Sequence, residues 1–288
     1  MGTLQKYYWL TKPGIVFSNV IAAMAGFFLA SAHSGRLDLW LFLSVVVGTA
    51  FVIASACVLN NYLDRGMDRK MKRTSWRATA SGQITTRAVF SYTIILGLIG
   101  FGSLIVFTSS LVVGLEALAY FSYIVLYGIA KRKTIHSTLV GTIPGAIPPV
   151  AGYVAVTGKF DLASLLLFLV LVTWQMPHFY SIGMRRRDEY AKADIPVMPV
   201  VKGMYATKVQ ILFYVAAFII ANLLLVIFGY TGYIYLFVVG IVGAIWLAKG
   251  VRGFKADDDQ KWAKRMFLFS LVVLLVLCTM LAVGGLLP

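Results

Sequence analysis

The feature that most constrains this chain is a series of nine stretches, each roughly 20 residues long, that contain very few charged side chains. A helix of about that length crosses the hydrocarbon layer of a bilayer. Hydrophobic residues make up 60% of the chain and charged residues 13%, which is more apolar surface than a soluble core of this size can bury. We therefore predict an all-α integral membrane protein with nine transmembrane helices around a central cavity. The predicted spans are residues 14–31, 39–62, 88–108, 111–130, 138–156, 162–184, 208–229, 232–249 and 266–286.

Lysine and arginine placement predicts the orientation of these spans. If the spans alternate in direction, all of the 26 basic residues except Arg36 and Lys159 fall on one side of the membrane. The positive-inside rule then places the N-terminus and the connections after the second, fourth, sixth and eighth spans in the cytoplasm. The first span lacks a small-residue cleavage site after a short apolar core, so we expect it to be retained. The same bias explains the net charge of +15, and we expect no nucleic-acid binding.

Two connections on the basic side are long and polar, and their positions suggest that the chain consists of two similar halves. They follow the second and sixth spans, which suggests that spans one to four and five to eight are related units within one domain. We expect both connections to face one shared cavity, capping it. Cys57 and Cys278 lie within apolar spans, so we expect small core residues rather than a disulfide or a metal site.

The second span ends in the polar stretch NNYLDRGMDRKMKRT at residues 60–74. Asn60, Asp64 and Asp68 are spaced four residues apart, which lines up their side-chain oxygens on one face of a continuous helix. Such oxygens suit Mg²⁺, which also accepts phosphate oxygens and water as ligands. The neighbouring basic side chains can bind phosphate oxygens: Arg65, Arg69, Lys70, Lys72, Arg73 and Arg77. The pattern fits a metal-bridged diphosphate site, and it also fits a solvated helix end with ion pairs.

A second polar cluster follows the sixth span, in WQMPHFYSIGMRRRDEYAKADIPVMPVVKG at residues 174–203. His178 and Glu189 would share a helix face if the helix continued past Pro177, although we expect Pro177 to kink or open it. His178 is either a polar residue satisfied inside the bundle or a ligand or proton-handling group in a cavity. The charges alone do not choose between these interpretations.

Both stretches, together with LTKPGI at residues 10–15 and GTIPGAIPPVAGY at 141–153, resemble the UbiA superfamily of intramembrane prenyltransferases. The N-x-x-x-D-x-x-x-D spacing at residues 60–68 is similar to the superfamily's first metal-diphosphate motif. WQMPHF and IPVMPV are similar to the haem-farnesylating branch. The likeness covers nearly the whole chain, which implies one transmembrane prenyltransferase domain over residues 1–288.

The resemblance implies transfer of the farnesyl group of farnesyl diphosphate to a vinyl group of haem b, with addition of water, giving haem O and diphosphate. It implies Mg²⁺ as cofactor, held by Asn60, Asp64, Asp68, Asp188 and Glu189, of which the first four are the expected catalytic residues. His178 is the expected haem-binding residue. The expected diphosphate-binding residues are Arg65, Arg69, Lys72, Arg73, Arg77, Lys131, Arg132, Arg187 and Lys202.

The same resemblance implies a bacterial inner-membrane protein whose N-terminus and site loops are cytoplasmic. Its expected partners are the two substrates, membrane lipid and factors that assemble terminal oxidases. Two other functions remain open: prenylation of a quinone-precursor or chlorophyll-type ring by the same fold, and transport of a phosphorylated lipid or anion.

The chain departs from the superfamily pattern at several positions. The second motif is usually a fuller aspartate repeat, whereas here His178 stands near its first acid and only Asp188 and Glu189 follow. Gly66 stands where an acid can occur, and Ala78 stands where a proline often follows the preceding arginine. The resemblance assigns no role to Glu116 inside the fourth span, and we expect it to snorkel or to carry a proton.

Overall fold

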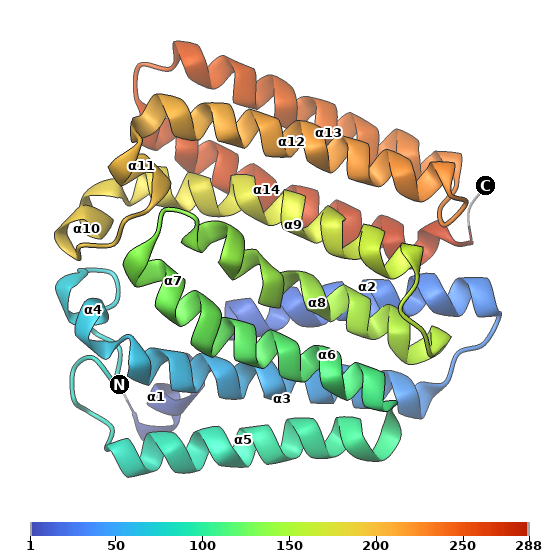
Figure 1. Cartoon of the computed structure of the whole chain (residues 1–288), viewed down its shortest axis with the longest axis horizontal. Coiled ribbons are helices and arrows are strands. Elements are labelled where there is room, and N and C mark those ends of the chain that lie inside the picture. Colours follow the sequence, from blue (N-terminus) through green and yellow to red (C-terminus); the bar gives the residue numbers. More distant parts are fainter. Residues whose placement is uncertain (1, 287–288) are drawn as a thin grey trace.

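Nine long helices form the body of the computed structural model, which describes residues 2–286 (Figure 1). Each is long and apolar enough to cross a membrane, and the described residues include no strand. The nine predicted spans and the all-helical fold are thus confirmed. The spans are α2 (Pro13–Ser34), α3 (Leu39–Leu63), α5 (Thr86–Phe107), the fourth span (Ser110–Lys133), α8 (Ser137–Thr157), α9 (Leu162–Arg185), α12 (Gly203–Ile227), α13 (Tyr233–Arg252) and α14 (Asp259–Gly284).

The fourth span consists of three consecutive segments. A short π-helix, η1 (Ser122–Leu126), lies between α6 (Ser110–Phe121) and α7 (Tyr127–Lys133). Such single π-helical turns inside an α-helix are frequent at functional sites. This one lies in the middle of the span, and its Ser122 is buried.

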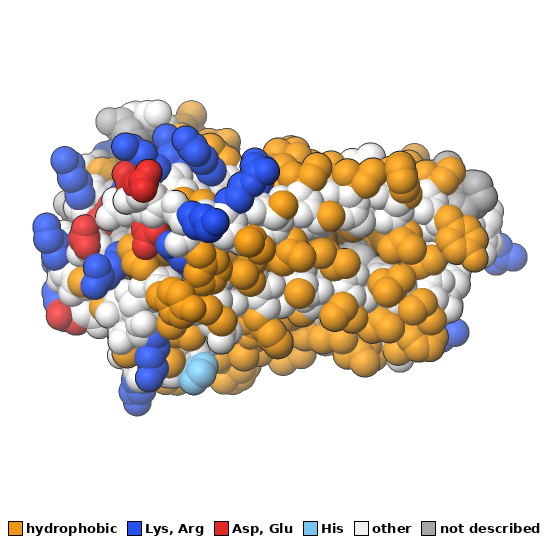
Figure 2. All heavy atoms as spheres, turned by 90° about the horizontal axis from the view of Figure 1, so that it is seen from above, with side chains coloured by type: hydrophobic (Ala, Val, Ile, Leu, Met, Phe, Trp, Pro, Cys, Tyr) orange, Lys and Arg blue, Asp and Glu red, His pale blue; other side chains and the backbone are white. Residues whose placement is uncertain are grey.

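Short helices and most of the charged side chains gather at one end of the bundle, which we call the basic end (Figures 1 and 2). The short helices there are α1 (Thr3–Leu10), α4 (Arg65–Lys70), α10 (Arg187–Lys192), α11 (Met198–Val201) and the 3₁₀ turn η2 (Gly253–Lys255). Hydrophobic side chains cover the long flank seen in Figure 2. A lipid-facing flank between two polar ends is what a membrane-spanning bundle requires.

Polar residues set where several spans begin. The side chains of Asp38, Thr85 and Ser109 each accept a hydrogen bond from a backbone N–H in the first turn of the helix that follows. Asp161 forms a reciprocal capping box with Ser164 at the start of α9. These caps satisfy N–H groups that have no partner within the helix.

The seventh and ninth spans begin earlier than predicted, at Gly203 and Asp259 instead of residues 208 and 266. Both helices extend beyond the apolar run because polar residues near their starts find partners. Lys208 is buried, donates to the backbone oxygen of Gly253 at 2.7 Å and pairs with Asp259 at 2.5 Å. Hydropathy marks where the lipid begins, which is not where the helix begins.

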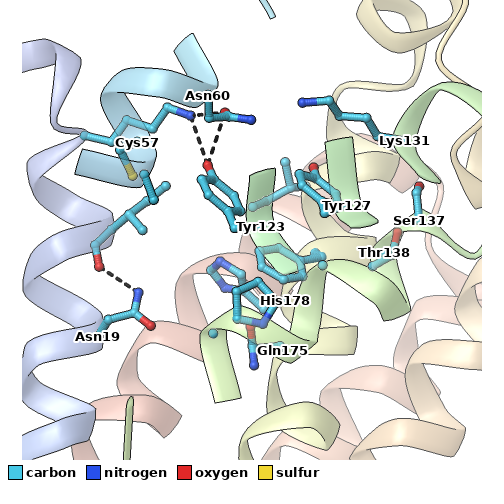
Figure 3. Close-up of a pocket in the computed structure, with 18 of the residues that line it drawn as sticks. Asn19, Cys57, Asn60, Tyr123, Tyr127, Lys131, Ser137, Thr138, Gln175 and His178 are labelled. Carbon is cyan, nitrogen blue, oxygen red and sulfur yellow. Dashed lines mark hydrogen bonds between the residues drawn. The ribbon is translucent and has the colours of Figure 1, made fainter. Parts of the chain in front are cut away.

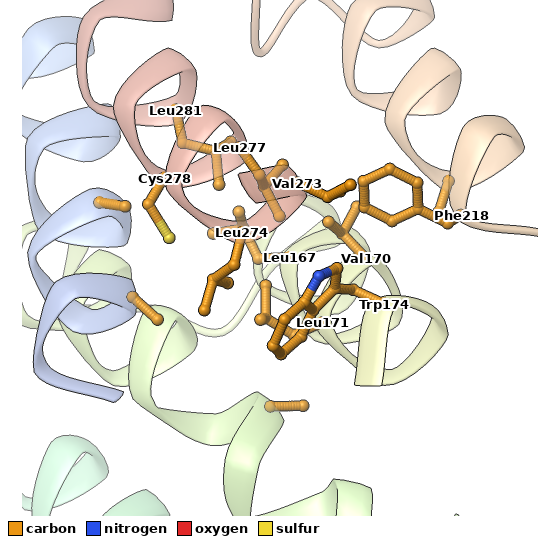
Figure 4. Packing of buried hydrophobic residues seen from close by; sticks show 14 of the residues in the cluster. Leu167, Val170, Leu171, Trp174, Phe218, Val273, Leu274, Leu277, Cys278 and Leu281 are labelled. Carbon is orange, nitrogen blue, oxygen red and sulfur yellow. The ribbon is translucent and has the colours of Figure 1, made fainter. Parts of the chain in front are cut away.

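The largest buried apolar cluster surrounds α9, with α14 and α12 packed against it (Figure 4). Leu167 and Leu171 of α9 lie among Leu274 and Leu277 of α14 and Phe218 of α12. Two polar links anchor the same helices: Trp174 Nε1 donates to the Ser270 backbone oxygen, and His178 contacts the Ser270 side chain. Helix α9 therefore has little freedom to move, and it forms one wall of the cavity described below.

Helices α2 and α8 approach each other through glycines. A methyl group at Gly26 would lie 1.9 Å from the Pro149 backbone oxygen, and one at Gly152 would lie 2.0 Å from the Ala23 oxygen. In lipid, where helices gain little hydrophobic free energy by associating, such close packing is a main source of helix–helix affinity. This α2–α8 seam fixes a second wall of the cavity.

Candidate active site

A cavity of about 410 Å³ lies between the helices and extends inward from the basic end (Figure 3). Its charged part is lined by Asp68 and Arg77, and its inner part by Glu116, Leu171 and Leu274. Residues from both long polar connections take part in the lining. The cavity is thus charged at one end and largely apolar at the other.

The predicted oxygen row lines this cavity. Helix α3 ends at Leu63 and α4 begins at Arg65, so Asp64 lies at a turn and the helix is not continuous as the spacing argument assumed. The hydrogen-bond ladder nevertheless crosses the turn, since Asp64 N bonds to Asn60 O and Asp68 N bonds to Asp64 O, both at 2.9 Å. The four-residue spacing therefore still directs all three side chains into one cavity.

A second row with the same spacing faces the first from the fourth span. Tyr123, Tyr127 and Lys131 all line the cavity, and the two tyrosine rings stack with centroids 5.9 Å apart (Figure 3). Tyr123 donates to Asn60 Oδ1 at 3.2 Å, and Lys131 pairs with Asp64. The sequence interpretation included Lys131 but missed the tyrosines, although their spacing of four from Lys131 in an otherwise charge-poor span was a usable signal.

Each member of the oxygen row has its own basic partner. Lys12 Nζ donates to Asn60 Oδ1 at 2.7 Å, Lys131 pairs with Asp64, and Arg77 Nη1 contacts both Asp68 oxygens, at 2.9 and 3.1 Å. Arg73 also lines the cavity, and no acid lies within ion-pair distance of it among the described residues. Four basic groups against two carboxylates give this part of the cavity an excess of positive charge, which favours an anion with several negative charges.

Lys12 was absent from the predicted site residues, although it belongs to LTKPGI. It adopts a left-handed backbone conformation, φ 51°, between α1 and α2, and its side chain reaches Asn60 and the Tyr123 hydroxyl at 3.1 Å. A non-glycine residue held in this region points to a functional constraint. Burial lowers the pKa of Lys12 from 10.5 to about 8, and the nearby positive charge of Arg77 acts in the same direction.

The chemistry of this donor set fits Mg²⁺. Asn60 and the two carboxylates supply hard oxygen atoms, and Asp64 Oδ1 accepts no hydrogen bond from the described residues. The described residues contain no cluster of three or more His, Cys, Asp or Glu side chains that could hold a metal by themselves. A metal held here would therefore take its remaining ligands from a diphosphate and water, as Mg²⁺ usually does.

Several predicted diphosphate ligands of the first connection do not line the cavity. Arg65 stacks on the Tyr62 ring at 4.0 Å, Arg69 donates to the Ala80 oxygen at 2.7 Å, and Lys72 is exposed. Arg132 donates to the Leu63 oxygen at 2.9 Å and lies 3.8 Å from Asp64. Arg65 and Arg132 thus bind backbone oxygens next to Asp64, those of Tyr62 and Leu63, from outside the cavity. Arg73 and Arg77 are the members of the predicted set that reach the interior with Lys131.

The predicted acids of the second connection also lie outside the cavity. Helix α9 continues through Pro177 and ends at Arg185, and a turn at Arg186 precedes α10. Because of this turn, Glu189 does not share a helix face with His178; it pairs with Arg186 at 2.6 Å instead. The other predicted site residues of this connection have exposed side chains: Arg187, Asp188 and Lys202.

What the second connection contributes to the cavity is apolar and aromatic. Tyr190, Ile195 and Val197 line it. The two connections also touch, through an apolar cluster of Met71 with Ala193 and Ile195 and through an exposed pair between Lys70 and Asp194 at 2.9 Å. Burial raises the pKa of the Tyr190 hydroxyl, so it stays a neutral hydrogen-bonding group.

His178 lines the inner part of the cavity in a defined tautomer. Ser270 Oγ donates its only hydrogen to the Phe267 oxygen at 2.6 Å, so His178 Nδ1, 2.8 Å from Oγ, must be the donor to it. Nε2 is then the nitrogen with a free lone pair, which is the form that binds iron. The ring stacks on Trp174 with centroids 5.0 Å apart, which fixes its plane.

Of the two expectations for Glu116, that it snorkels or that it carries a proton, the first is wrong. It is fully buried, lines the inner end of the cavity, and accepts a hydrogen bond from Thr49 at 2.6 Å. It lies on the inward face of α6, too far from the helix start for its short side chain to reach the end of the bundle. Its Oε2 has no hydrogen-bond partner among the described residues.

Comparison with protein families and comparison with curated proteins give consistent results. The profile of the UbiA prenyltransferase family matches residues 19–272. A protein from Chromohalobacter salexigens named protoheme IX farnesyltransferase is 45% identical over 281 residues, which cover 97% of this chain and 95% of that protein.

Solved structures show the same fold. A structure described for digeranylgeranylglyceryl phosphate synthase is similar with a TM-score of 0.78 at 19% identity, covering 99% of both chains. A UbiA homologue from Archaeoglobus fulgidus, bound to GPP and Mg²⁺, is similar with a TM-score of 0.69 at 14% identity, covering 96% of this chain and 99% of that one.

Proposed function

The chain belongs to the UbiA prenyltransferase family, and from that premise we propose that it transfers the farnesyl group of farnesyl diphosphate to a vinyl group of haem b. It is an integral membrane prenyltransferase. The similarity of 45% over nearly the full chain to a protoheme IX farnesyltransferase supports haem b as the acceptor. One observation of the molecule supports the reaction most strongly: three oxygen-bearing side chains and four basic ones converge in one cavity that is apolar further in.

Asn60, Asp64 and Asp68 are the residues that would hold Mg²⁺, and the homologue bound to GPP and Mg²⁺ supports that cofactor. When bound, Mg²⁺ neutralises charge on the diphosphate as a Lewis acid. We propose that Lys12, Lys131 and Arg77 then exchange their present oxygen partners for diphosphate oxygens. Such pre-placed cations stabilise the charge that grows on the leaving group.

The carbon–oxygen bond of the substrate breaks and its electron pair leaves with the diphosphate. The vinyl π electrons of haem b form the new carbon–carbon bond to the farnesyl cation. Water adds to the cation left on the other vinyl carbon and loses a proton, which converts the vinyl group into a hydroxyethylfarnesyl side chain. The stacked rings of Tyr123 and Tyr127 and the apolar wall beyond them keep bulk water from the first cation. His178, through Nε2, is proposed to hold the haem iron.

The acids of the second connection would need a rearrangement of α10 to take part. Asp188 and Glu189 can reach a metal only if α10 turns toward the cavity, which would also bring Arg187 closer to the diphosphate. We further propose that the basic end faces the cytoplasm of a bacterial inner membrane, because positive charge is retained on that side. A terminal-oxidase assembly factor docking on that face is the corresponding partner proposal, and co-purification tests it.

The test of the reaction uses purified protein with Mg²⁺, farnesyl diphosphate and haem b. We expect stoichiometric release of diphosphate and a haem product heavier by one hydroxyfarnesyl group. Formation of diphosphate with no haem product, together with a prenylated quinone precursor when that ring is supplied, would assign a different acceptor to the same fold.

A further inference from the structure

The inner end of the cavity holds a polar group that the proposed reaction does not use. Glu116 is fully buried in α6, receives one hydrogen bond from Thr49 of α3, and leaves Oε2 without a partner among the described residues. An ionisable side chain at this depth in a membrane bundle is costly, and such residues are usually functional. The charged groups that the proposed mechanism uses lie toward the other end of α3, at Asn60 and beyond it.

The lining between the oxygen row and Glu116 is suited to a hydrocarbon chain. Val52, Ile53 and Ala56 of α3 face Ala119 and Tyr120 of the fourth span across this part of the cavity. An allylic diphosphate whose head is held at Asn60 would place its apolar tail against such a wall. Glu116 closes the inner end of this path, and Thr49, buried behind it, donates a hydrogen bond to its carboxyl group.

The length of the path matches a chain of fifteen carbons. Thr49 and Asn60 lie on the same helix, so the rise of 1.5 Å per residue separates them by about 16 Å along its axis. A farnesyl chain has twelve main-chain carbons, which extend over about 14 Å at roughly 1.25 Å of advance per carbon–carbon bond. A geranylgeranyl chain is longer by four main-chain carbons, about 5 Å on the same basis, and its end would meet the Glu116 carboxyl group.

The backbone behind this carboxyl group cannot yield easily. A methyl group added at Gly100 of α5 would lie 2.7 Å from Val52 N, and one at Gly48 would lie 2.4 Å from the Leu104 side chain. Helices α3 and α5 are therefore in direct contact just behind Thr49. Packed interiors of this kind resist displacement by an extra isoprene unit.

We infer that the Glu116–Thr49 pair is the floor of the prenyl-chain pocket and limits the donor to fifteen carbons. This inference rests on the proposed function, because it takes a prenyl diphosphate as the occupant. The floor acts in two ways: it fills the space that a fourth isoprene unit needs, and it presents a carboxyl group that an apolar chain end cannot satisfy. Selectivity of this kind, for or against a few carbons in an apolar pocket, is worth about 10- to 200-fold.

The experiment measures binding of non-ionising thiolo analogues of geranyl, farnesyl and geranylgeranyl diphosphate to the purified full chain with Mg²⁺. Wild type should bind the farnesyl analogue about tenfold or more tightly than the geranylgeranyl analogue. Glu116→Ala should bring the two dissociation constants within about twofold. Glu116→Gln, which keeps the shape and polarity, is the matched control and should keep the wild-type preference.

A second variant, which shortens the pocket instead of lengthening it, keeps the inference testable if Glu116→Ala folds poorly. Ala119 lies one turn closer to the oxygen row on the same helix and lines the cavity. Ala119→Leu should weaken farnesyl binding about tenfold and leave geranyl binding unchanged. An unchanged selectivity in Glu116→Ala, equal loss of all three ligands in Ala119→Leu, or a change in haem affinity alone would overturn the inference.

The binding measurement also separates this inference from the proposed function. It needs no acceptor, so a wild-type protein that fails to farnesylate haem b contradicts the proposed acceptor while the chain-length result still stands. Conversely, a wild-type protein that forms the haem product with no chain-length shift in the variants contradicts the floor alone.

Discussion

Both long polar connections carry acidic and basic side chains, but they place these charges differently. The first, at the α3–α4 junction, directs Asp64 and Asp68 into the cavity, where each has a basic partner. The second, around α10, keeps Asp188 on the surface and sends Tyr190 and other apolar groups inward. The presence of charges therefore does not tell which polar loop forms a site. The backbone hydrogen bonds continue across both junctions, but Asp64 keeps a right-handed helical conformation, φ −90° and ψ −2°, whereas Arg186 departs from it, φ −114° and ψ 20°.

The largest expected effect comes from the first connection. Asp64→Asn should lower kcat about 100-fold or more, because it removes an anionic oxygen ligand from the place where leaving-group charge is stabilised. Haem-product formation by purified protein measures it. Asp194→Asn is the matched control, since this exposed acid of the second connection pairs only with Lys70 and its left-handed backbone, φ 57°, also suits asparagine. Equal activity of the two variants would remove the contrast between the connections.

The next effect concerns the helix that leads into the second connection. His178→Ala should raise the KM for haem b roughly tenfold, about 1.4 kcal/mol, and change farnesyl diphosphate binding much less. Ser270→Ala keeps the imidazole but removes the acceptor that fixes its tautomer, so a smaller rise is expected. The absorption spectrum of bound haem provides a second measurement. Equal weakening of both substrates would indicate that His178 only supports packing.

An effect of similar size, on kcat, is expected within the second connection itself. Asp188→Asn should lower kcat less than Asp64→Asn does, by about tenfold, because its carboxylate lies outside the cavity unless α10 turns inward. The two variants should be compared at several Mg²⁺ concentrations. A loss as large as that of Asp64→Asn, relieved by added Mg²⁺, would show that both connections hold metal during turnover.

The smallest effect is a pH dependence at the first connection. Lys12 has a pKa of about 8, so it carries its charge below that pH and loses it as the pH rises further. Affinity for the farnesyl thiolo analogue should therefore fall about three- to tenfold between pH 7 and 9.5. Lys12→Arg, whose guanidinium stays charged, should bind with a flatter pH profile. A fall of the same size in the arginine variant would assign the titration to another group near the cavity.

The fold was largely predictable because the bilayer imposes one dominant length on each apolar segment. The oxygen row was also predictable. The turn at Asp64 keeps its i→i−4 backbone hydrogen bonds, so residues spaced by four still lie on one face. What the spacing could not provide was the partner of each oxygen. Lys12 and Asn60 are far apart in the sequence and meet only because α1 folds back against α3.

The second connection was harder to predict for a physical reason. Helix α9 ends at Arg185, and beyond the turn Ile195 and Ala193 pack on Met71 of the first connection. Such a contact between residues far apart in the sequence cannot be read from the charges of the segment. Glu116 is a similar case. The sequence shows only that an ionisable side chain lies within an apolar span. Its partner Thr49 and its position at the end of a cavity follow from the arrangement of α3 and α6. The relation of the two four-span halves stays a prediction.

The glycine seam between α2 and α8 has a consequence for the order in which the molecule is made. Gly26 belongs to the first span and Gly152 to the fifth, so the contact cannot form until more than half of the chain has been synthesised. Before then Asn60 and Asp64 are already inside the nascent bundle with no wall opposite α2 to enclose them. The substrate cavity is therefore a late product of biosynthesis, and a chain stopped before its fifth span would carry the charged row without a compartment around it.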